Sequence, residues 1–276
     1  MDNVTKRFIN PFEIAVHLWR HRYLIVQLTK RELVTRYRGS FLGMAWSVIY
    51  PLLMLAVYTF VFSIVFRAKW GVGIEQGRLG FALNLFMGIL TFSLFGEPAN
   101  SSPLLVVGNA NYVKKMVFPL EVLPVVVVLS TMINTAIGLG VLVVALMIIN
   151  HSLPWTIILL PFVWILPLLF SLGCAYFLAS LGVFIRDLGS AITLFTTILF
   201  FISPVFYPID AVPPKFRVFI HLNPLSLFIR QARQVALWGE VPDWQQYLTG
   251  LLVSVSICCV GFIWFVKTKK GFADVT

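Results

Sequence analysis

The side chains that carry most enzyme chemistry are few and scattered in this sequence. The histidines are His17, His21, His151 and His221, and the cysteines are Cys174, Cys258 and Cys259. His17 and His21 have the four-residue spacing of metal ligands on a helix, but they lie in a basic segment where a solvated helix face is the alternative. The cysteines fall in apolar segments without a Cys-x-x-Cys pair, which favours buried small hydrophobic side chains. We therefore expect no metal site, no bound cofactor and no catalytic residue in this chain.

The sequence also lacks the means to use ATP directly. It contains no Gly-x-x-x-x-Gly-Lys-Ser/Thr motif, the loop that holds nucleotide phosphates. The longest stretch that is not plainly apolar, residues 209–247, is too short for a nucleotide-binding domain. A proton-driven pump is poorly supported, because Glu97 is joined only by Glu121 and Asp187 near the ends of apolar segments. Any energy that this protein uses must come from a partner protein or a gradient.

The elements that position these residues are expected to be membrane helices. Hydrophobic residues make up 59% of the 276 residues and charged residues only 12%, about half the usual share in soluble domains. A membrane span needs roughly 20 apolar residues. Apolar segments of suitable length cover residues 41–66, 81–107, 120–149, 155–184, 191–207 and 247–266. The sequence predicts an all-α integral membrane protein with six transmembrane helices.

The distribution of basic residues predicts the orientation of these helices. The segments on the same side as the N-terminus hold about twice as many Lys and Arg residues as those on the other side. Both termini are therefore expected in the cytoplasm, with residues 1–40 and the tail 271–276 flanking a membrane domain over residues 41–270. The net charge of +10 then reflects topology and contact with anionic lipid, and we expect no nucleic-acid partner.

Two segments outside the spans are expected to lie at the membrane surface. Residues 11–31 form a basic amphipathic pattern with Trp19 and Tyr23, which suits the headgroup region, although a helix packed on a partner protein is the alternative. Residues 209–247 hold short amphipathic pieces broken at prolines, which predict interfacial or re-entrant helices. Glu97 either faces protein or a water-filled path, or the second span ends near Phe95 and leaves it at the interface.

Three motifs along the chain resemble those of one protein family. The first is Arg36-Tyr37-Arg38-Gly39-Ser40-Phe41-Leu42-Gly43-Met44-Ala45-Trp46. The second is Asn109-Ala110-Asn111 with Lys114-Lys115 and Phe118-Pro119-Leu120-Glu121. The third comprises Ser203-Pro204-Val205-Phe206-Tyr207-Pro208, Leu222-Asn223-Pro224-Leu225 and Arg233. In this order the motifs resemble the permease subunits of ABC-2-type polysaccharide exporters, most of all those that export O-antigen of lipopolysaccharide.

The resemblance implies partners and a substrate. It implies a homodimer in the bacterial inner membrane, paired with two copies of a separate nucleotide-binding ATPase that binds ATP and Mg. The exported substrate would be an undecaprenyl-type lipid-linked polysaccharide. The residues implied in ATPase coupling are Asn111, Tyr112, Lys114, Lys115, Phe118, Arg186 and Asp187. Tyr112 departs from the aliphatic residue expected there, and a loop that serves only as a topology determinant is the alternative.

A hypothesis for the transport mechanism adds a gate and a channel, built from residues near the ends of the predicted spans. A cytoplasmic gate that attracts a lipid pyrophosphate head group would use Arg36, Tyr37, Arg38, Gly39 and Ser40. Because sugars stack on aromatic rings, the candidates for a glycan channel are Tyr58, Phe62, Glu97, Phe206 and Tyr207. Aromatic rings in a membrane protein also form interfacial belts and core packing, which is the alternative for each of them, and the gate arginines can equally be topology anchors.

Two other functions remain open from the sequence. A membrane-embedded enzyme acting on lipid-linked sugars would need catalytic groups on a large loop, where residues 209–247 offer only Asp210, Glu240 and Asp243. An ABC-2 permease for a drug or lipid would share the same architecture.

Overall fold

The computed structural model describes residues 11–65, 70, 78–113 and 118–272, and every secondary-structure element in these ranges is helical. This confirms the predicted all-α class. The α-helices are α2 (Pro11–Arg20), α3 (Arg22–Tyr37), α4 (Trp46–Tyr58), α5 (Arg78–Ser101), α6 (Ala110–Val113), α7 (Val122–Asn150), α8 (Leu160–Phe184), α9 (Leu188–Ile202), α10 (Pro214–Leu222), α11 (Pro224–Arg233) and α12 (Trp244–Thr268). Two π-helical stretches, Thr59–Val65 and Gln234–Trp238, extend α4 and α11.

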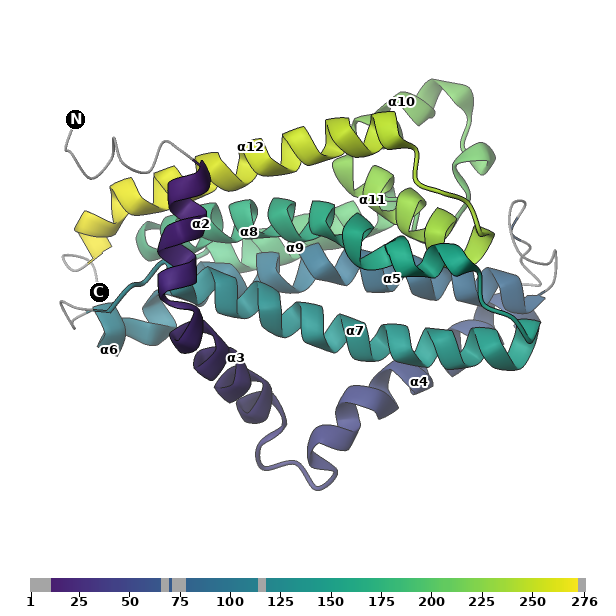
Figure 1. Ribbon diagram of the computed structural model, residues 1–276, viewed down its shortest axis with the longest axis horizontal. Helices are drawn as coiled ribbons and strands as arrows, with labels where there is room; N and C mark the ends of the chain where they lie inside the picture. Colours follow the sequence, from purple (N-terminus) through teal and green to yellow (C-terminus); the bar gives the residue numbers. More distant parts are fainter. Residues whose placement is uncertain (1–10, 66–69, 71–77, 114–117, 273–276) are drawn as a thin grey trace.

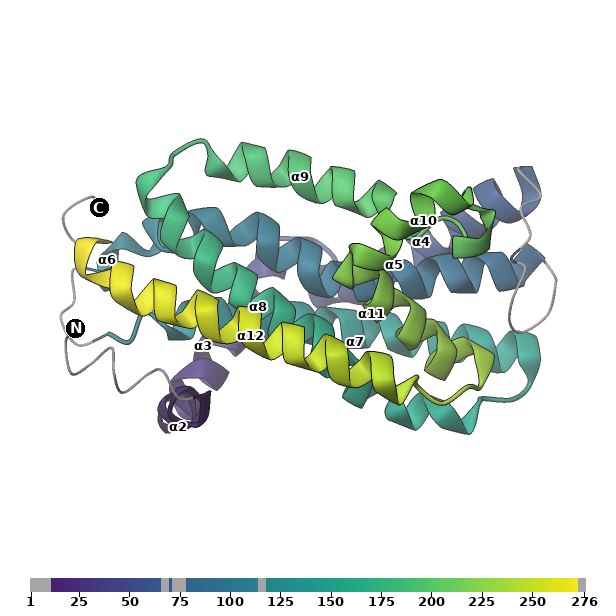
Figure 2. The ribbon, with the colours of Figure 1, turned by 90° about the horizontal axis from the view of Figure 1, so that it is seen from above.

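The body of the molecule is a bundle in which α5, α7, α8 and α12 run side by side (Figure 1). Five helices of the described chain are long and apolar enough to cross a membrane: Gly43–Phe62, Gly80–Leu104, Val122–Ile149, Trp155–Phe184 and Trp244–Gly271. The second of these, built on α5, lies at the centre, since 83% of its apolar window is buried. The apolar helix α9 is shorter, at 15 residues, and lies along one side of the bundle (Figure 2).

Glycines allow α8 and α12 to pack at backbone contact. A Cβ atom at Gly173 would meet the backbone of Ile257 and Cys258 at 2.5–2.6 Å, and one at Gly261 would meet the carbonyl of Gly173. Close approach of this kind is typical of helix pairs in membranes, where small residues replace the hydrophobic effect as the source of packing.

Several boundaries differ from the sequence prediction for local reasons. The N-terminal helix is two helices, which meet at a turn at His21, and the second continues to Tyr37 before Gly39, whose φ is +85°. The predicted fifth span ends at Ile202 and not at Tyr207, because Pro204 favours an extended conformation at Ser203. In α5 the helix runs through Glu97 and Pro98 to Ser101 and does not end near Phe95.

A buried arginine holds the region between α9 and α12 in place. The Arg233 guanidinium donates from Nε to the Asn84 carbonyl (2.9 Å), from Nη1 to that of Pro204 (2.6 Å) and from Nη2 to that of Val205 (2.8 Å). It also lies 4.4 Å from the ring centre of Trp70. Arg233 thus connects α11 to α5 and to the turn after α9, with carbonyl dipoles in place of a counter-ion.

Candidate functional site

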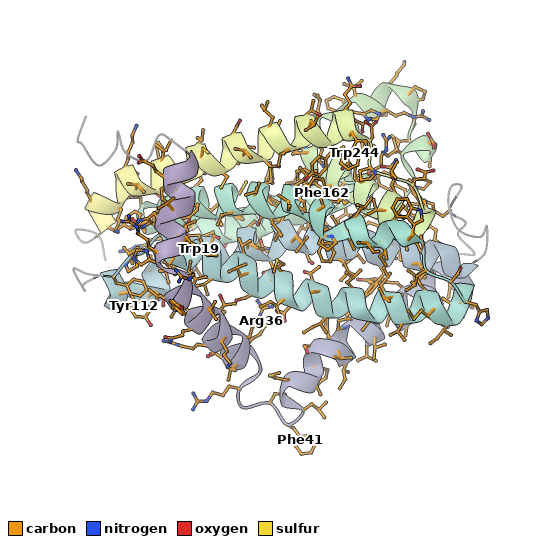
Figure 3. All side chains as sticks on the ribbon, in the orientation of Figure 1. Trp19, Arg36, Phe41, Tyr112, Phe162 and Trp244 are labelled. Atoms are coloured by element: carbon orange, nitrogen blue, oxygen red, sulfur yellow. The ribbon has the colours of Figure 1, made fainter. Side chains whose placement is uncertain are left out.

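Two of the predicted coupling residues, Tyr112 and Phe118, lie together at one end of the bundle. Tyr112 of α6 stacks on Phe118 with ring centres 4.3 Å apart and planes 9° from parallel. Arg31 of α3 donates a hydrogen bond of 2.8 Å to the Tyr112 hydroxyl. Figure 3 shows Tyr112 at the end of the molecule where α2 and α3 cross the bundle. The surface helices and the predicted coupling loop are therefore joined directly.

The remaining predicted coupling residues are less connected. Arg186 and Asp187 are exposed in the turn between α8 and α9, which lies at the same end of the bundle as α6 (Figure 2). Asn111 lies in α6. Lys114 and Lys115 lie outside the described residues.

An ion pair next to this loop ties it to the last long helix. Lys269 Nζ lies 2.9 Å from Glu121 Oε1 and 3.1 Å from Oε2, and the Glu121 carboxylate is almost fully buried. The Tyr176 hydroxyl donates to the Glu121 backbone carbonyl at 2.9 Å. Burial lowers the pKa of His17 in α2, and the Glu121 carboxylate acts in the opposite direction. Glu121 therefore connects the loop to α8 and to the end of α12.

The predicted gate contains a second ion pair. Arg36 Nη1 at the end of α3 lies 3.0 Å from Glu97 Oε2 of α5, and Thr131 Oγ1 of α7 donates to the same oxygen at 3.4 Å. The side chains of Arg36 and Glu97 are 36% and 43% exposed. Arg38, Gly39 and Ser40 are exposed in the connection from α3 to α4. Tyr37 ends α3.

A cavity of about 550 Å³ lies beside the Arg36–Glu97 pair. It lies between the pair α3–α4 and the pair α5–α7. Its polar lining residues are Arg36, Ser40, Ser47, Tyr50, Tyr58, Ser93, Glu97, Asn134 and Thr135. The cavity therefore offers one positive and one negative side chain among hydroxyl and amide groups, a lining suited to a polar or charged ligand.

The predicted channel residues fall in two places. Tyr58 and Glu97 line the cavity. Phe62 stacks on Phe81 (5.5 Å between ring centres) and lies 6.1 Å from Phe206, within an apolar cluster. The Tyr207 hydroxyl donates to the Ile202 carbonyl at 2.6 Å, at the end of α9. Tyr58 and Glu97 thus share one cavity, whereas Phe62 and Phe206 pack in an apolar cluster, the alternative stated for them.

Comparison with known proteins decides the family. Residues 23–237 match the ABC-2 type transporter family. The chain belongs to this family. It is 28% identical to the O-antigen export system permease protein RfbA of Myxococcus xanthus, over 93% of this chain and 96% of that protein. It is 30% identical to the protein of the same name from Klebsiella pneumoniae, over 91% and 94% of the two chains. A polysialic acid transport protein, KpsM of Escherichia coli, is 20% identical over 77% of this chain and 81% of its own length. The predicted resemblance is confirmed.

Sequence reasoning missed several connections in this ABC-2 family chain. It considered Glu121 only as an acidic residue near the end of an apolar segment, and it gave no partner to Arg31, at the end of the predicted surface segment, or to Lys269, after the last predicted span. Their partners lie 81 and 148 positions away, so no local pattern could have paired them. The sequence feature that pointed to a connection of this kind was Glu97, because an acidic side chain in an apolar segment needs a polar partner.

Proposed function

We propose that this chain is the membrane-spanning permease subunit of an ABC exporter that carries a lipid-linked polysaccharide of the O-antigen class across the bacterial inner membrane. The observation that carries the proposal is the match to two O-antigen export permeases over nearly the full length of each. ATP hydrolysis would occur on a separate subunit that binds ATP and Mg.

The proposed topology has six spans with both termini in the cytoplasm. Helix α9 would be the fifth span, although its 15 residues extend only about 22 Å at 1.5 Å per residue. The turn from Ser203 to Tyr207 would complete the crossing. Helices α10 and α11 would then form the re-entrant segment, which is supported by the packing of α11 against α5 and α8.

The proposed partners follow from two surfaces. The corner formed by Arg31, Tyr112 and Phe118 would contact the ATPase, of which two copies would bind. Helix α4 has no buried residue, and its exposed apolar side chains include Leu52, Leu53 and Val57. A second copy of the chain would cover part of this surface in a homodimer, with lipid on the rest.

The proposed substrate path begins at Arg36. Guanidinium groups bind phosphate through paired N–H donors, so Arg36 beside the cavity suits a prenyl diphosphate head group of the undecaprenyl type. Arg38 and Ser40 lie exposed in the same connection and would add to the attraction. The glycan would pass Tyr58, where an aromatic ring permits sliding contact.

The acidic residues between α9 and α12 have structural partners, which weighs against an enzyme. Asp243 accepts hydrogen bonds from the backbone N–H groups of Gln245 and Gln246 as the N-cap of α12. Asp210 lies 3.9 Å from Arg217, and Glu240 accepts from Gln234 at 3.4 Å. A chain with all three acidic residues changed to amides should still export, whereas an enzyme using them should lose turnover.

The deciding experiment deletes this gene in its host and measures lipid-linked glycan on each side of the inner membrane, with the wild-type chain as complementation. Finished polymer trapped on the cytoplasmic side, with surface polymer lost, supports the proposal. Normal export after deletion refutes it. Polymer that reaches the outside unattached or unfinished supports a membrane-embedded enzyme instead.

A further inference from the structure

The Arg36–Glu97 ion pair spans the space between α3 and the central helix. Arg36 is the penultimate residue of α3, and Glu97 lies in the second half of α5, 61 positions later. Figure 1 shows α3 and α4 descending from the bundle as two arms that meet away from it, and Figure 3 places Arg36 on the arm formed by α3 and Phe41 at the tip. The ion pair therefore links the C-terminal end of α3 to α5 in the bundle.

Glu97 holds the position where an anionic ligand of Arg36 would bind. An ionised carboxylate accepts hydrogen bonds only, and here it accepts from Arg36 and Thr131. Carboxylate and phosphate present similar oxygen acceptors to a guanidinium. Among the described residues that line the cavity, the two charged ones are Arg36 and Glu97. The pair leaves the cavity without net charge until one partner is displaced.

The connection between the two arms is built to move. Gly39 and Gly43 have φ values of +85° and +50°, and no atom lies within 4 Å of the place where either would carry a Cβ. Phe41 between them is fully exposed, and α4 has no buried residue. Positive φ without surrounding packing marks a backbone that few contacts hold in one conformation.

We propose that Glu97 is a built-in competitor of the phosphate group: it occupies Arg36 in the unloaded protein, and the diphosphate of a prenyl-linked substrate displaces it, which releases the end of α3 from α5. The inference rests on the proposed function, because it names how the head-group site is regulated. Both side chains are more than one-third exposed, so a ligand that enters the cavity can reach the pair without unfolding it.

The first test measures binding of farnesyl pyrophosphate, a short prenyl diphosphate, to the full chain co-purified with its ATPase partner in nanodiscs. Glu97→Gln removes the competing charge and should tighten binding about fivefold, the upper range for a partly exposed ion pair. Arg36→Gln should abolish binding. Glu32→Gln is the matched control, because Glu32 is an exposed glutamate of α3 and its loss changes the net charge equally. Unchanged or weaker binding by Glu97→Gln would overturn the proposal.

A second ligand separates the lipid head group from free phosphate. Inorganic pyrophosphate should gain about the same factor from Glu97→Gln but bind more weakly than farnesyl pyrophosphate in every variant, because it lacks the apolar chain that reaches the lipid beside α4. If Glu97→Gln tightens the binding of inorganic pyrophosphate but not that of farnesyl pyrophosphate, the assignment of the site to a lipid carrier is overturned. Glu97→Asp keeps the charge on a shorter side chain, and its binding should fall between that of wild type and Glu97→Gln.

A third measurement tests whether the Arg36–Glu97 ion pair holds α3 to α5. Ser93→Cys places a thiol on α5 in the cavity lining, where the side chain is only partly exposed, in a chain whose three native cysteines are replaced by serine. Its rate of maleimide labelling should rise when Glu97 is also changed to Gln, and when farnesyl pyrophosphate is added with Glu97 intact. Equal rates in all samples would refute release of the end of α3 from α5. If the wild-type chain restores polysaccharide export while Glu97→Gln changes neither binding nor labelling, the inference fails and the proposed function stands.

Discussion

Arg31 Nη1 lies 2.8 Å from the hydroxyl oxygen of Tyr112, and the Tyr112 ring in turn stacks on Phe118. The hydrogen bond joins a surface helix to a loop 81 positions later in the chain. The tyrosine that departs from the aliphatic residue expected at this position therefore supplies a contact that an aliphatic side chain could not make. A force on the loop would reach α3 through this bond.

Tyr112→Phe should loosen α3 from the loop while keeping the ring stack. Loss of one partly exposed hydrogen bond corresponds to roughly 0.5–1 kcal/mol, so trypsin should cleave α3 about two to five times faster than in wild type. Tyr23→Phe is the matched control, because it removes the hydroxyl of an exposed tyrosine in α3 itself. Equal cleavage rates in both variants would show that the bond does not hold α3.

The Glu121–Lys269 pair should contribute measurably to stability. Glu121→Gln or Lys269→Met leaves one partner of a largely buried pair uncompensated, and each single change should cost about 2 kcal/mol, reduced from the fully buried value because Lys269 is 32% exposed. The double variant should cost less than the sum of the two. The free energies of unfolding of the wild type, the two single variants and the double variant can be measured in mixed micelles with increasing SDS. If the two single effects add exactly in the double variant, the side chains do not interact directly.

Gly182→Ala should severely lower the amount of folded protein. A Cβ atom at Gly182 of α8 would collide with the backbone of Pro103, including its carbonyl oxygen, and neither can move without shifting a helix. Gly140→Ala in α7 is the control, since nothing lies within 4 Å of its Cβ position. That change should be neutral or stabilise the helix by up to about 1 kcal/mol. Fluorescence size-exclusion chromatography of both variants tests the contrast.

Arg233→Met should destabilise the protein by at least about 3 kcal/mol, because three buried carbonyl groups lose their charged donor. Arg233→Lys should rescue only in part, since one ammonium group cannot reproduce the planar fork that reaches all three carbonyls. Arg230→Met, on the same helix and only half-buried, should change stability by less than about 1 kcal/mol. Melting curves of the purified chains rank the three variants, and equal melting temperatures for Arg233→Met and Arg230→Met would refute the clamp.

His17 should make the docking of α2 sensitive to acid. Burial lowers the pKa of His17 from its usual 6.5. Nearby groups that act on this pKa are Glu121, which raises it, and His21, Lys269 and Arg20, which lower it. The folded state thus binds fewer protons than the unfolded state between the two pKa values, so stability is intact above about pH 6.5 and declines as the pH falls below it. His17→Gln should flatten the dependence of the melting temperature between about pH 7.5 and 5.5. A variant with the wild-type slope would assign the effect to another group.

Composition and periodicity determined much of this protein without a structure. Apolar runs of span length require helices in a membrane, because lipid offers no partner for an unpaired backbone N–H or C=O group. The three ordered motifs indicated the ABC-2 family, which the family match confirms. These properties are local: each depends on residues that are neighbours along the chain.

Only the tertiary structure decided which side chains meet. Glu97 needed a partner, yet whether that partner was Arg36, Arg38 or water depended on the angle between α3 and α5. Arg233 belonged to a motif that indicated the family, and Lys269 was one of the basic residues after the last apolar segment, but neither had a predicted partner. Their contacts with Asn84 and Glu121 join residues 149 and 148 positions apart, which only the packed bundle brings together. A helix pattern fixes which residues share a face, but the face of another helix that it meets is set by the packing of the whole bundle.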